Sequence, residues 1–478
     1  MSLVIILDCG ATNLRAIAID KQGGIVASHY LRNETVSGLE RADFHVWDFE
    51  QIWQKLSVCC REVMSKVAER EISAVSVTTF GVDGAPFDAQ GNQIYPIISW
   101  KCPRTTAVMK QVEEEFDREL LYRENGIGDY SFNTLYKLKW LKDNQPEIHQ
   151  QMDKFVFISS MITSQLSGVA STDRTMAGTS MLTNLSDGSW NQRALEYLEL
   201  TTDHFAPTVN AGEVIGHVQQ EAASETGLPE GVPIVSTGHD TQFALYGSGA
   251  QENQAFLSSG TWEILMARSQ QPSLNAQVRA EGLTVELDSK AGLCNPAIQW
   301  LSSAVLEWVA TRFYSDVEDG SAKYELMISE AAEVPSGCNG VRFKPSFAVD
   351  ESGQGGGELT GLSINTTRGE IYRAALEGLA EQLRQSVERL TGSCQLKQDN
   401  LMVVGGGARN RLWNQIRADV LGRPIQVVEQ PESTVIGAAM YAFAGVGEFD
   451  SPYAAQQAMK PSFKTVLPSQ PTEEGQHA

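Results

Sequence analysis

Three short loops combine glycine with acidic or hydroxyl side chains, and each one follows an apolar, strand-like run. They are Asp8-Cys-Gly-Ala-Thr12, Ser258-Ser-Gly-Thr261 and Gly405-Gly-Gly407. Turns of this composition expose consecutive backbone N–H groups, which bind phosphate without needing net positive charge. An acidic residue beside such a loop, as Asp8 is, can hold Mg²⁺ or its waters. Together the loops predict a triphosphate and a purine nucleoside as ligand, whereas each loop alone is equally explained by a tight hairpin.

A fourth polar segment, Gly238-His-Asp-Thr241, follows the strand-like run 233–236. A carboxylate at a strand end can take a proton from a hydroxyl nucleophile, and Asp240 is the candidate for that role. The competing interpretation is structural, with Asp240 capping a helix that begins at Thr241. Adjacent residues on an extended chain point in different directions, so His239 and Asp240 do not by themselves form a dyad. A histidine metal site is not indicated, because the seven histidines show no ligand spacing.

The elements that must position these loops alternate between strand and helix patterns. Apolar residues at helical spacing predict a helix near 49–68, and 401–428 predicts a strand, a Gly-rich loop, a helix and a strand. Residues 3–27 predict a β-meander, and the strand–turn–strand pattern at 255–267 repeats the plan of 3–19. This alternation predicts the α/β class. The repetition about half a chain apart predicts two related domains.

The composition limits the partners. The chain has 478 residues, with 37 basic against 59 acidic residues and a net charge of −22. This balance argues against nucleic acid or an anionic membrane as partner, because both attract basic surfaces. Seven scattered cysteines without a Cys-x-x-Cys pair predict reduced thiols and a cytoplasmic protein. No signal peptide is predicted, and no stretch reaches the ~20 apolar residues that cross a bilayer.

The loop at Gly405 supports a second interpretation, a dinucleotide-binding site. It follows a strand and opens a helix, and Glu429 ends the next strand, where a ribose-binding acid is expected. Against this, Asn410 replaces the third glycine of the fingerprint, and no further βαβ partner follows. A dinucleotide-dependent oxidoreductase therefore stays as an alternative. A P-loop is absent from the sequence.

In combination, these motifs resemble a known family. Asp8-x-Gly-x-Thr with Arg15, Gly238-His-Asp240, Ser258-Ser-Gly-Thr261 and Gly405-Gly-Gly407 occur in the order expected for the FGGY family of carbohydrate kinases. The resemblance extends over nearly the whole chain, and the longer matching segments are 78–84, 98–105, 132–137, 175–179, 238–245, 258–265 and 373–378. It implies two actin-like (ribonuclease H-like) domains, with sugar and ATP in the cleft between them. The first, 1–245, would bind the sugar, and the second, 246–478, the nucleotide.

The resemblance also implies roles for individual residues. Asp240 matches the catalytic base, and Asp8 matches the acid near the metal ion and the transferring phosphate. The remaining positions that match nucleotide contacts are Gly10, Thr12, Asn13, Arg15, Ser259, Gly260, Thr261, Gly405, Gly406 and Gly407. By similarity to rhamnulokinase-like members, the candidate sugar contacts are Gly81, Asp83, His239, Thr241 and Asn295.

Two departures from the family pattern concern these contacts. Ala11 stands where the first phosphate loop usually has threonine, so that hydroxyl contact is lost or moves to Thr12. Cys102 stands where the Trp-x-Asp-x-Arg pattern has aspartate, which leaves Arg104 as the candidate sugar contact there.

The implied activity is phosphoryl transfer from MgATP to the 1-hydroxyl of a ketose. L-fuculose, giving L-fuculose 1-phosphate, is the first expectation, and L-rhamnulose or another ketose is the alternative. A non-catalytic actin-like ATP-binding protein is the alternative of another class. The expected partners are a small-molecule ketose and ATP with Mg²⁺, without nucleic acid or membrane, and a homodimer is left open by the sequence.

Overall fold

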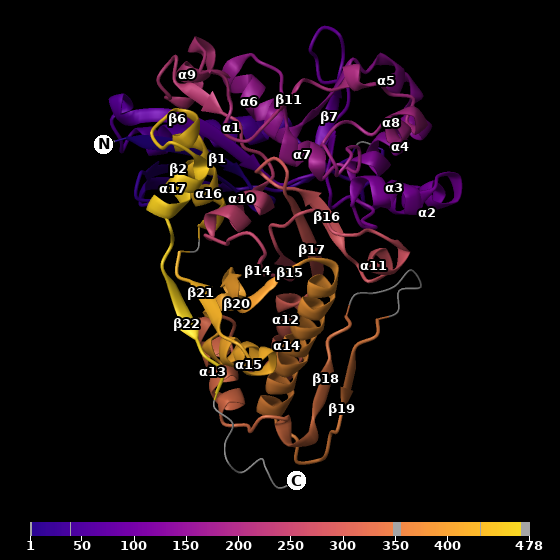
Figure 1. Ribbon diagram of the computed structural model, residues 1–478, viewed down its shortest axis with the longest axis vertical. Coiled ribbons are helices and arrows are strands. Elements are labelled where there is room, and N and C mark those ends of the chain that lie inside the picture. Colours follow the sequence, from indigo (N-terminus) through magenta and orange to yellow (C-terminus); the bar gives the residue numbers. More distant parts are fainter. Residues whose placement is uncertain (1, 39, 348–354, 431, 470–478) are drawn as a thin grey trace. The chain divides into compact units, whose positions relative to one another are not determined.

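The computed structural model describes residues 2–38, 40–347, 355–430 and 432–469 (Figure 1). The chain divides into two compact units. The first comprises Met1–Gly249, Gln270–Asn295 and Glu432–Pro461, and the second comprises Ala250–Ser269, Pro296–Pro431 and Ser462–Ala478. The sequence predicted a single boundary at 245/246. The structure differs because two later segments, 270–295 and 432–461, pack with the first unit.

The first unit is built on a six-stranded sheet with the order β12-β13-β6-β1-β2-β3. Its strands are β1 (Leu3–Cys9), β2 (Asn13–Asp20), β3 (Ile25–Arg32), β6 (Ile72–Thr79), β12 (Val214–His217) and β13 (Pro233–Val235). β1, β6 and β13 run parallel, whereas β2 and β3 continue antiparallel from β1. The predicted β-meander is therefore confirmed, although the polar turn is shorter than predicted because Asp8 and Arg15 are paired strand residues.

Helices and short strands surround this sheet. The helices are α1 (Phe49–Met64), α2 (Thr106–Glu115), α3 (Arg118–Asn125), α4 (Thr134–Asn144), α5 (Pro146–Gln151), α6 (Ile158–Ser167), α7 (Arg174–Gly178), α8 (Gln192–Tyr197), α9 (Gln220–Thr226), α10 (Asp240–Gly247), α11 (Ala276–Ala280), α16 (Ser433–Gly445) and α17 (Pro452–Ala458). The short strands are β4 (Val36–Ser37), β5 (His45–Trp47), β7 (Gly84–Phe87), β8 (Ile97–Ile98), β9 (Lys154–Phe157), β10 (Thr172–Asp173), β11 (Thr208–Val209) and β16 (Thr284–Leu287). Short 3₁₀ turns lie at Glu69–Glu71, Pro103–Thr105 and Thr202–His204.

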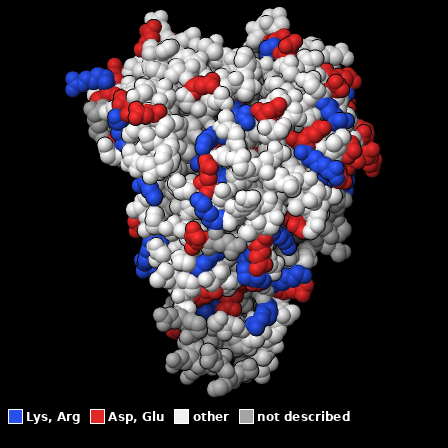
Figure 2. Space-filling view, viewed as in Figure 1, with Lys and Arg blue, Asp and Glu red and all other residues white. Residues whose placement is uncertain are grey.

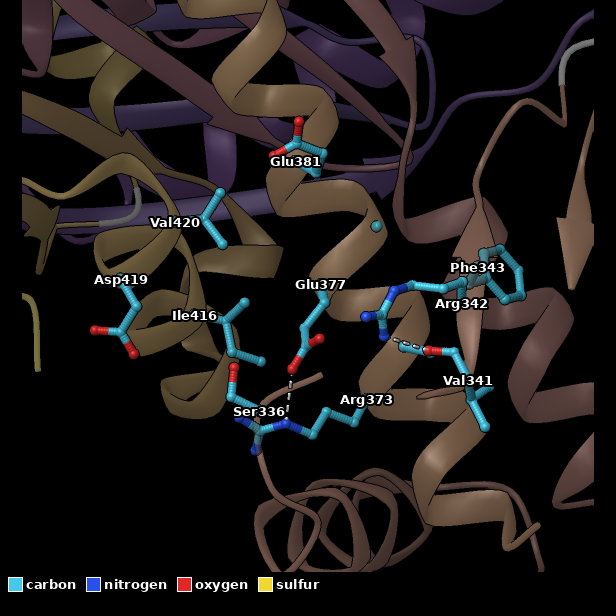
Figure 3. Close-up of a pocket in the computed structure, with 12 residues that line it drawn as sticks. Ser336, Val341, Arg342, Phe343, Arg373, Glu377, Glu381, Ile416, Asp419 and Val420 are labelled. Atoms are coloured by element: carbon cyan, nitrogen blue, oxygen red, sulfur yellow. Dashed lines mark hydrogen bonds and ion pairs between the residues drawn. The ribbon is translucent and has the colours of Figure 1, made fainter. Parts of the chain in front are cut away.

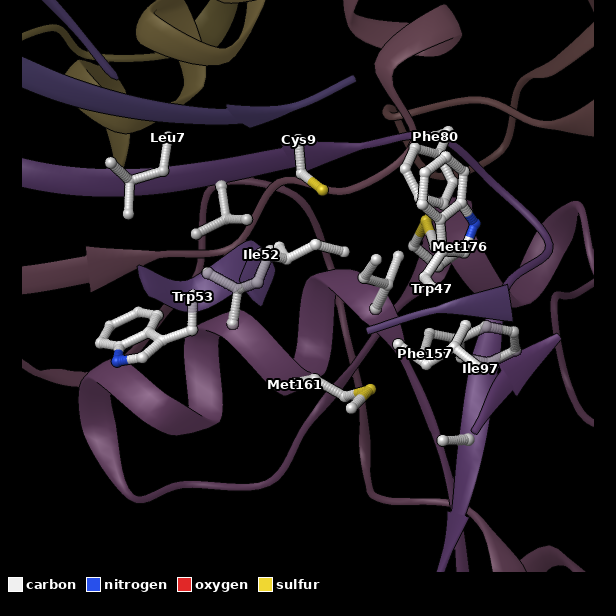
Figure 4. Close-up of a cluster of buried hydrophobic side chains, with 14 of the residues drawn as sticks. Leu7, Cys9, Trp47, Ile52, Trp53, Phe80, Ile97, Phe157, Met161 and Met176 are labelled. Carbon is white, nitrogen blue, oxygen red and sulfur yellow. The ribbon is translucent and has the colours of Figure 1, made fainter. Parts of the chain in front are cut away.

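The central strands bury both faces, because side chains alternate along a strand and both faces are covered by helices. Leu7 belongs to the apolar core that includes Ile52 of α1 and Met161 of α6 (Figure 4). Its neighbour Ile6 belongs to a second core, which includes Val435 and other residues of α16. The first unit is thus a three-layer α/β structure.

Helix α16 explains why the chain returns to the first unit. Its sequence is apolar on all sides, which predicts a fully buried helix. A Cβ atom added to Gly247 would overlap the carbonyl oxygen of Ser433, and one added to Gly437 would overlap that of Phe243. α10 and α16 therefore touch through their backbones.

The second unit contains a sheet with the strand order β17-β15-β14-β20-β21-β22. The strands are β14 (Gln254–Ser259), β15 (Trp262–Met266), β17 (Cys294–Leu301), β20 (Lys397–Val404), β21 (Ile425–Val428) and β22 (Phe463–Val466), with β18 (Arg342–Lys344) and β19 (Glu358–Thr360) as a separate pair. The helices are α12 (Ser303–Phe313), α13 (Ser321–Ala332), α14 (Arg368–Ser393) and α15 (Arg411–Leu421), with 3₁₀ turns at Cys338–Gly340 and Gly406–Arg409.

The two sheets share one topology. β14, β20 and β21 are parallel, and β15 and β17 continue antiparallel from β14, just as β1, β6 and β13 relate to β2 and β3. The repeated strand–turn–strand pattern therefore predicted two related domains correctly.

Other features of the whole chain bear on its partners. None of the seven cysteines, which all lie within the described residues, forms a disulfide bond, as their spacing predicted, and all seven are buried. Within the described ranges, the helices are too short or too polar to cross a bilayer. On the face in Figure 2, acidic and basic side chains are interspersed.

Candidate active site

Three polar segments of the first unit lie at or after the carboxyl ends of adjacent parallel strands. Asp8 is the last residue but one of β1, Gly81–Asp83 follows β6, and His239–Asp240 follows β13. Ligand sites of α/β sheets form at this end of the strands. The carboxylates of Asp8, Asp83 and Asp240 also all interact with one thiol, that of Cys9. Burial is the largest cause that raises the pKa of Cys9, and the three carboxylate charges add to it. The structure therefore brings together residues that are far apart in sequence.

Asp240 begins helix α10. The residue before the helix is His239, so Asp240 is the first helical residue and not the cap of a helix starting at Thr241. Its side chain keeps 31% of its surface accessible. Desolvation raises the pKa of Asp240 above the usual carboxyl range, His239 opposes this shift, and the charge of Asp8 adds to it. A raised pKa makes the carboxylate a stronger base.

His239 lies between two carboxylates. Its Nε2 is 3.5 Å from Asp240 Oδ1, and its Nδ1 is 3.6 Å from Glu286 Oε2. Burial lowers the pKa of His239, but the two carboxylates outweigh burial and raise it overall. A Cβ atom added to Gly81 would lie 2.7 Å from His239 Nε2, so glycine is required at 81 for this placement.

Glu286, in β16, is held by three side chains. Thr179 Oγ1 donates to Oε1 at 2.6 Å, the amide of Gln242 donates to Oε2, and His239 faces the same oxygen. Burial acts to raise the pKa of Glu286, yet these donors lower it overall. Glu286 was not predicted from sequence, because an isolated Glu in a strand carries no motif.

Asp8 is engaged by groups of its own unit. Its Oδ2 accepts from Arg15 Nε at 2.8 Å and Nη2 at 2.5 Å, and its Oδ1 accepts from Thr78 Oγ1 at 2.9 Å. Arg15 Nη1 also donates to Glu432 at 2.5 Å. Two carboxylates thus already balance Arg15, which leaves it poorly suited to neutralise a phosphate.

A different cation lies at the loop between β1 and β2. Lys101 Nζ donates to the carbonyl of Ala11 at 3.2 Å, and its ammonium lies 5.3 and 5.5 Å from the ring centroids of Trp47 and Trp100. Thr12 and Asn13 beside it are exposed. Lys101 was missed from sequence because only the fold places residues 11 and 101 together.

Asp83 is fully buried and makes an ion pair with Lys137 of α4. Its Oδ2 also accepts from the indole N–H of Trp47 at 2.7 Å and from the backbone N–H of Trp100 at 3.1 Å. Burial raises the pKa of Asp83, and Lys137 opposes the shift. The predicted sugar contact through Asp83 is not accessible here, because protein groups surround the carboxylate.

The residue before Asp83 has a strained backbone. Val82 has φ 62°, a conformation that β-branched residues rarely adopt. Its carbonyl accepts from Thr134 Oγ1 at 2.9 Å and from Lys137 Nζ at 3.0 Å. Strain of this kind costs about 1–3 kcal/mol and is often found at functional sites.

Two further predicted sugar contacts are buried among protein groups. Asn295 is fully buried and donates to Asp288 at 2.7 Å. Arg104 lies over the rings of Phe44 and Trp140, at 4.2 and 4.6 Å from their centroids.

Cys102 provides part of the surroundings of Arg104. Arg104 Nε donates to Cys102 Sγ at 3.1 Å, and Nη1 donates to Tyr95 Oη at 2.9 Å. The aspartate-to-cysteine departure therefore leaves Arg104 with aromatic and neutral partners instead of a carboxylate.

In the second unit, two loops follow adjacent parallel strands. Gly260–Thr261 follows β14 and Gly405–Gly407 follows β20, and Ser258 is in register with Val404. Thr261 is exposed and Gly260 half-exposed, as a phosphate contact requires, and Gly405 and Gly406 are exposed. Ser259 differs from this pattern, because it is fully buried and its hydroxyl is occupied by protein groups.

Known proteins are similar to this chain in sequence and in fold. The sequence matches the N-terminal domain of the FGGY family of carbohydrate kinases over 3–247 and the C-terminal domain over 255–446. The chain belongs to the FGGY family of carbohydrate kinases. It is 49% identical to an L-fuculokinase of Haemophilus influenzae over 98% of this chain and 100% of that protein. An L-fuculokinase of Escherichia coli K12 is 45% identical over 98% and 97%. The fold matches that of a xylulose kinase from Rhodospirillum rubrum, with a TM-score of 0.88, 24% identity and coverage of 98% and 94%.

Membership of this family sets aside the dinucleotide-dependent oxidoreductase and the non-catalytic ATP-binding protein. Asn410, which stands in place of the third glycine of the dinucleotide motif, has a structural role in this kinase. Its side chain accepts from the backbone N–H of Trp413 at 3.1 Å and so caps α15.

A pocket of ≈ 320 Å³ in the second unit of this kinase lies apart from these loops (Figure 3). Arg373 and Glu377 of α14 and Ile416 of α15 are among its lining residues, and Arg373 donates to Glu377 at 3.0 Å. None of the predicted site residues lines it.

A metal ion bound to the nucleotide would need acidic groups nearby. Among the described residues, no cluster of three or more His, Cys, Asp or Glu side chains could hold one. Mg²⁺ usually keeps several waters and binds through one or two carboxylates plus substrate phosphates. Asp8 fits such a partial site, and a second carboxylate, that of Asp240, is close enough for the charge of Asp8 to raise its pKa.

Proposed function

We propose that this carbohydrate kinase transfers the γ-phosphoryl group of MgATP to the 1-hydroxyl of L-fuculose, giving L-fuculose 1-phosphate and ADP. The observation that supports the substrate is the 49% identity to the Haemophilus L-fuculokinase over nearly the full length of both chains. L-rhamnulose is the second candidate, because a rhamnulokinase of Oceanobacillus iheyensis is 24% identical over 98% of both chains.

Asp240 is proposed as the general base. It would accept the proton of the 1-hydroxyl as that oxygen attacks the γ-phosphorus. In the same displacement the bond between the γ-phosphorus and the β–γ bridging oxygen breaks, and ADP leaves with that oxygen. Its raised pKa and partial accessibility support this role. His239 contacts Glu286 and fits against Gly81, which has no side chain, and it would orient the sugar next to Asp240.

The nucleotide is proposed to bind to the glycine loops. Gly10, Thr12 and Asn13 with Lys101, and Gly260 with Thr261, would hold the phosphates, while Gly405–Gly407 would accept the adenosine. Backbone N–H groups of such turns suit phosphate in an acidic protein. Mg²⁺ bound to the nucleotide would neutralise phosphate charge, and Asp8 would hold its waters.

The test of the base is Asp240→Asn, assayed by ADP release with ATP and L-fuculose. We expect kcat to fall by roughly 10²–10⁴-fold, because one positioned base contributes about that factor. Nucleotide binding and the melting temperature should stay unchanged. Asp203→Asn, at an exposed position of the same unit, is the matched control. Turnover near the wild-type rate in Asp240→Asn would disprove the assignment.

The substrate is tested with a panel of ketoses in the same assay. The proposal expects the highest kcat/KM for L-fuculose. A higher value for L-rhamnulose would replace the substrate but keep the mechanism, and ATP turnover independent of any sugar would reject both.

A further inference from the structure

A buried ion pair lies beneath the two glycine loops of the second unit. Arg417 of α15 and Glu263 of β15 are both fully inaccessible to solvent and are paired. The hydroxyl of Ser259 donates to Glu263 at 3.0 Å and accepts from Arg417 Nη2 at 2.7 Å. The indole N–H of Trp300 donates to the second carboxylate oxygen of Glu263 at 3.0 Å. These four side chains form one hydrogen-bonded cluster.

One side of the cluster holds the loop between β14 and β15. Ser259 ends β14 directly before Gly260, and Glu263 is its partner across the turn. The carbonyls of Gly260 and Thr261 accept from the backbone N–H groups of Ser303 and Ser302, at 3.2 and 3.0 Å. The turn is thus fixed from both ends.

The other side of the cluster reaches the loop after β20. Arg417 Nη1 donates to the side-chain oxygen of Asn414 at 3.1 Å, and the Asn414 amide donates to the carbonyl of Ala408 at 2.7 Å. Ser259 also touches this loop directly. A Cβ atom on Gly405 would lie 2.5 Å from the Ser259 carbonyl oxygen, and one on Gly407 would overlap the Ser259 hydroxyl.

The position of this ion pair is better explained by geometry than by stability. Replacing a buried ion pair by apolar side chains of similar size is often neutral or stabilising, whereas removing one partner is strongly destabilising. The guanidinium is planar and makes several directed bonds at once, so it can hold two segments at a set distance. Arg417 does this for both glycine loops through Ser259 and Asn414.

We propose that Arg417 and Glu263 are positioning residues that set the two glycine loops at the spacing a nucleotide requires, with Ser259 as the link between them. Ser259 then acts from inside the protein and does not contact phosphate, unlike the role predicted from the sequence. This inference rests on the proposed use of these loops for ATP.

The test removes both charges together, in the double variant Glu263→Gln with Arg417→Met, so that no lone charge stays buried. ADP affinity is measured by calorimetry without sugar, and the melting temperature is recorded in parallel. We expect a melting temperature close to wild type and ADP binding at least tenfold weaker. In the steady state, KM for ATP should rise while KM for the sugar stays within twofold. A folded double variant with wild-type ADP affinity would overturn the inference.

Two further variants keep the test decisive. Arg417→Lys retains the charge but loses the planar fork, so we expect a folded protein with intermediate ADP affinity; wild-type affinity there would also overturn the inference. The control is Glu381→Gln with Arg384→Met, a partly exposed pair on α14, which should leave ADP affinity unchanged. A wild-type protein that binds no ADP would reject the proposed function itself, which separates the two failures.

Discussion

The ion pair between Asp83 and Lys137 allows a quantitative prediction. Lys137→Met keeps the length of the side chain but removes its ammonium group. The carboxylate of Asp83 is fully buried and would then have no cation beside it. The variant therefore tests whether burial dominates the electrostatics of Asp83.

The free-energy cost of Lys137→Met depends on the hydrogen bonds that Asp83 keeps. Removing one partner of a buried ion pair costs about 3–5 kcal/mol. The N–H groups of Trp47, at 2.7 Å, and Trp100, at 3.1 Å, still donate to the carboxylate. Hydrogen bonds to a charged group each contribute about 1.5–3 kcal/mol. We therefore expect the lower end of the range, about 3 kcal/mol at pH 7.

The loss of stability in Lys137→Met should depend on pH and should become smaller at low pH. Burial raises the pKa of Asp83, and the variant removes Lys137, the largest opposing influence. The folded pKa of Asp83 already lies above the usual carboxyl value in the wild type, and the loss of Lys137 raises it further, so the folded variant binds the proton more readily than the folded wild type. The stability deficit relative to wild type should shrink as pH falls through the folded pKa, by up to about 1.4 kcal/mol per pH unit. Above that pKa the deficit is complete.

The assay is urea unfolding followed by tryptophan fluorescence at pH 5, 6, 7 and 8. Asp83→Asn combined with Lys137→Met removes both charges and should recover most of the stability without the pH slope. Lys142→Met is the matched control on the same helix, because Lys142 pairs with the exposed Glu199 and should cost less than about 1 kcal/mol. The reasoning is refuted if Lys137→Met unfolds like Lys142→Met at every pH.

Two further predictions concern the surroundings of His239. Gly81→Ala would place a Cβ atom 2.7 Å from His239 Nε2, so KM for the sugar should rise at least fivefold while ADP affinity stays unchanged. The control is Gly392→Ala, where the new Cβ meets nothing within 4 Å, and it should change neither quantity. An unchanged sugar KM in Gly81→Ala would contradict the placement. Glu286→Gln should lower the pKa of His239, because that carboxylate raises it and only Asp240 would remain. Histidine NMR titration measures the shift, and a pKa equal to or above the wild-type value would contradict the stated cause.

The order of elements followed largely from local sequence. Apolar runs separated by glycine-containing turns predicted β1, β2, β14 and β15, because strand and turn preferences act over a few neighbouring residues. Their repetition half a chain apart predicted two related sheets, and the common strand order confirms it. The four polar motifs sufficed for the family resemblance.

The domain boundary did not follow from local sequence. Helix α16 lies near the end of the chain, yet it packs on β1 at the beginning and on α10 in the middle. A long chain segment can return to a distant partner at small additional entropic cost. Contiguity in sequence is therefore a poor guide to which core an apolar helix joins.

By itself, the sequence determined which residues lie at or near strand ends and could do chemistry, namely Asp8, Asp240 and the glycine loops. The tertiary structure alone decided how each is surrounded. It placed Glu286 beside His239, balanced Arg15 with two carboxylates, and buried Ser259 and Asp83 among protein donors. The physical reason is that burial and ion pairing depend on distances of a few ångströms between residues far apart in the chain. No spacing within a single motif specifies those distances.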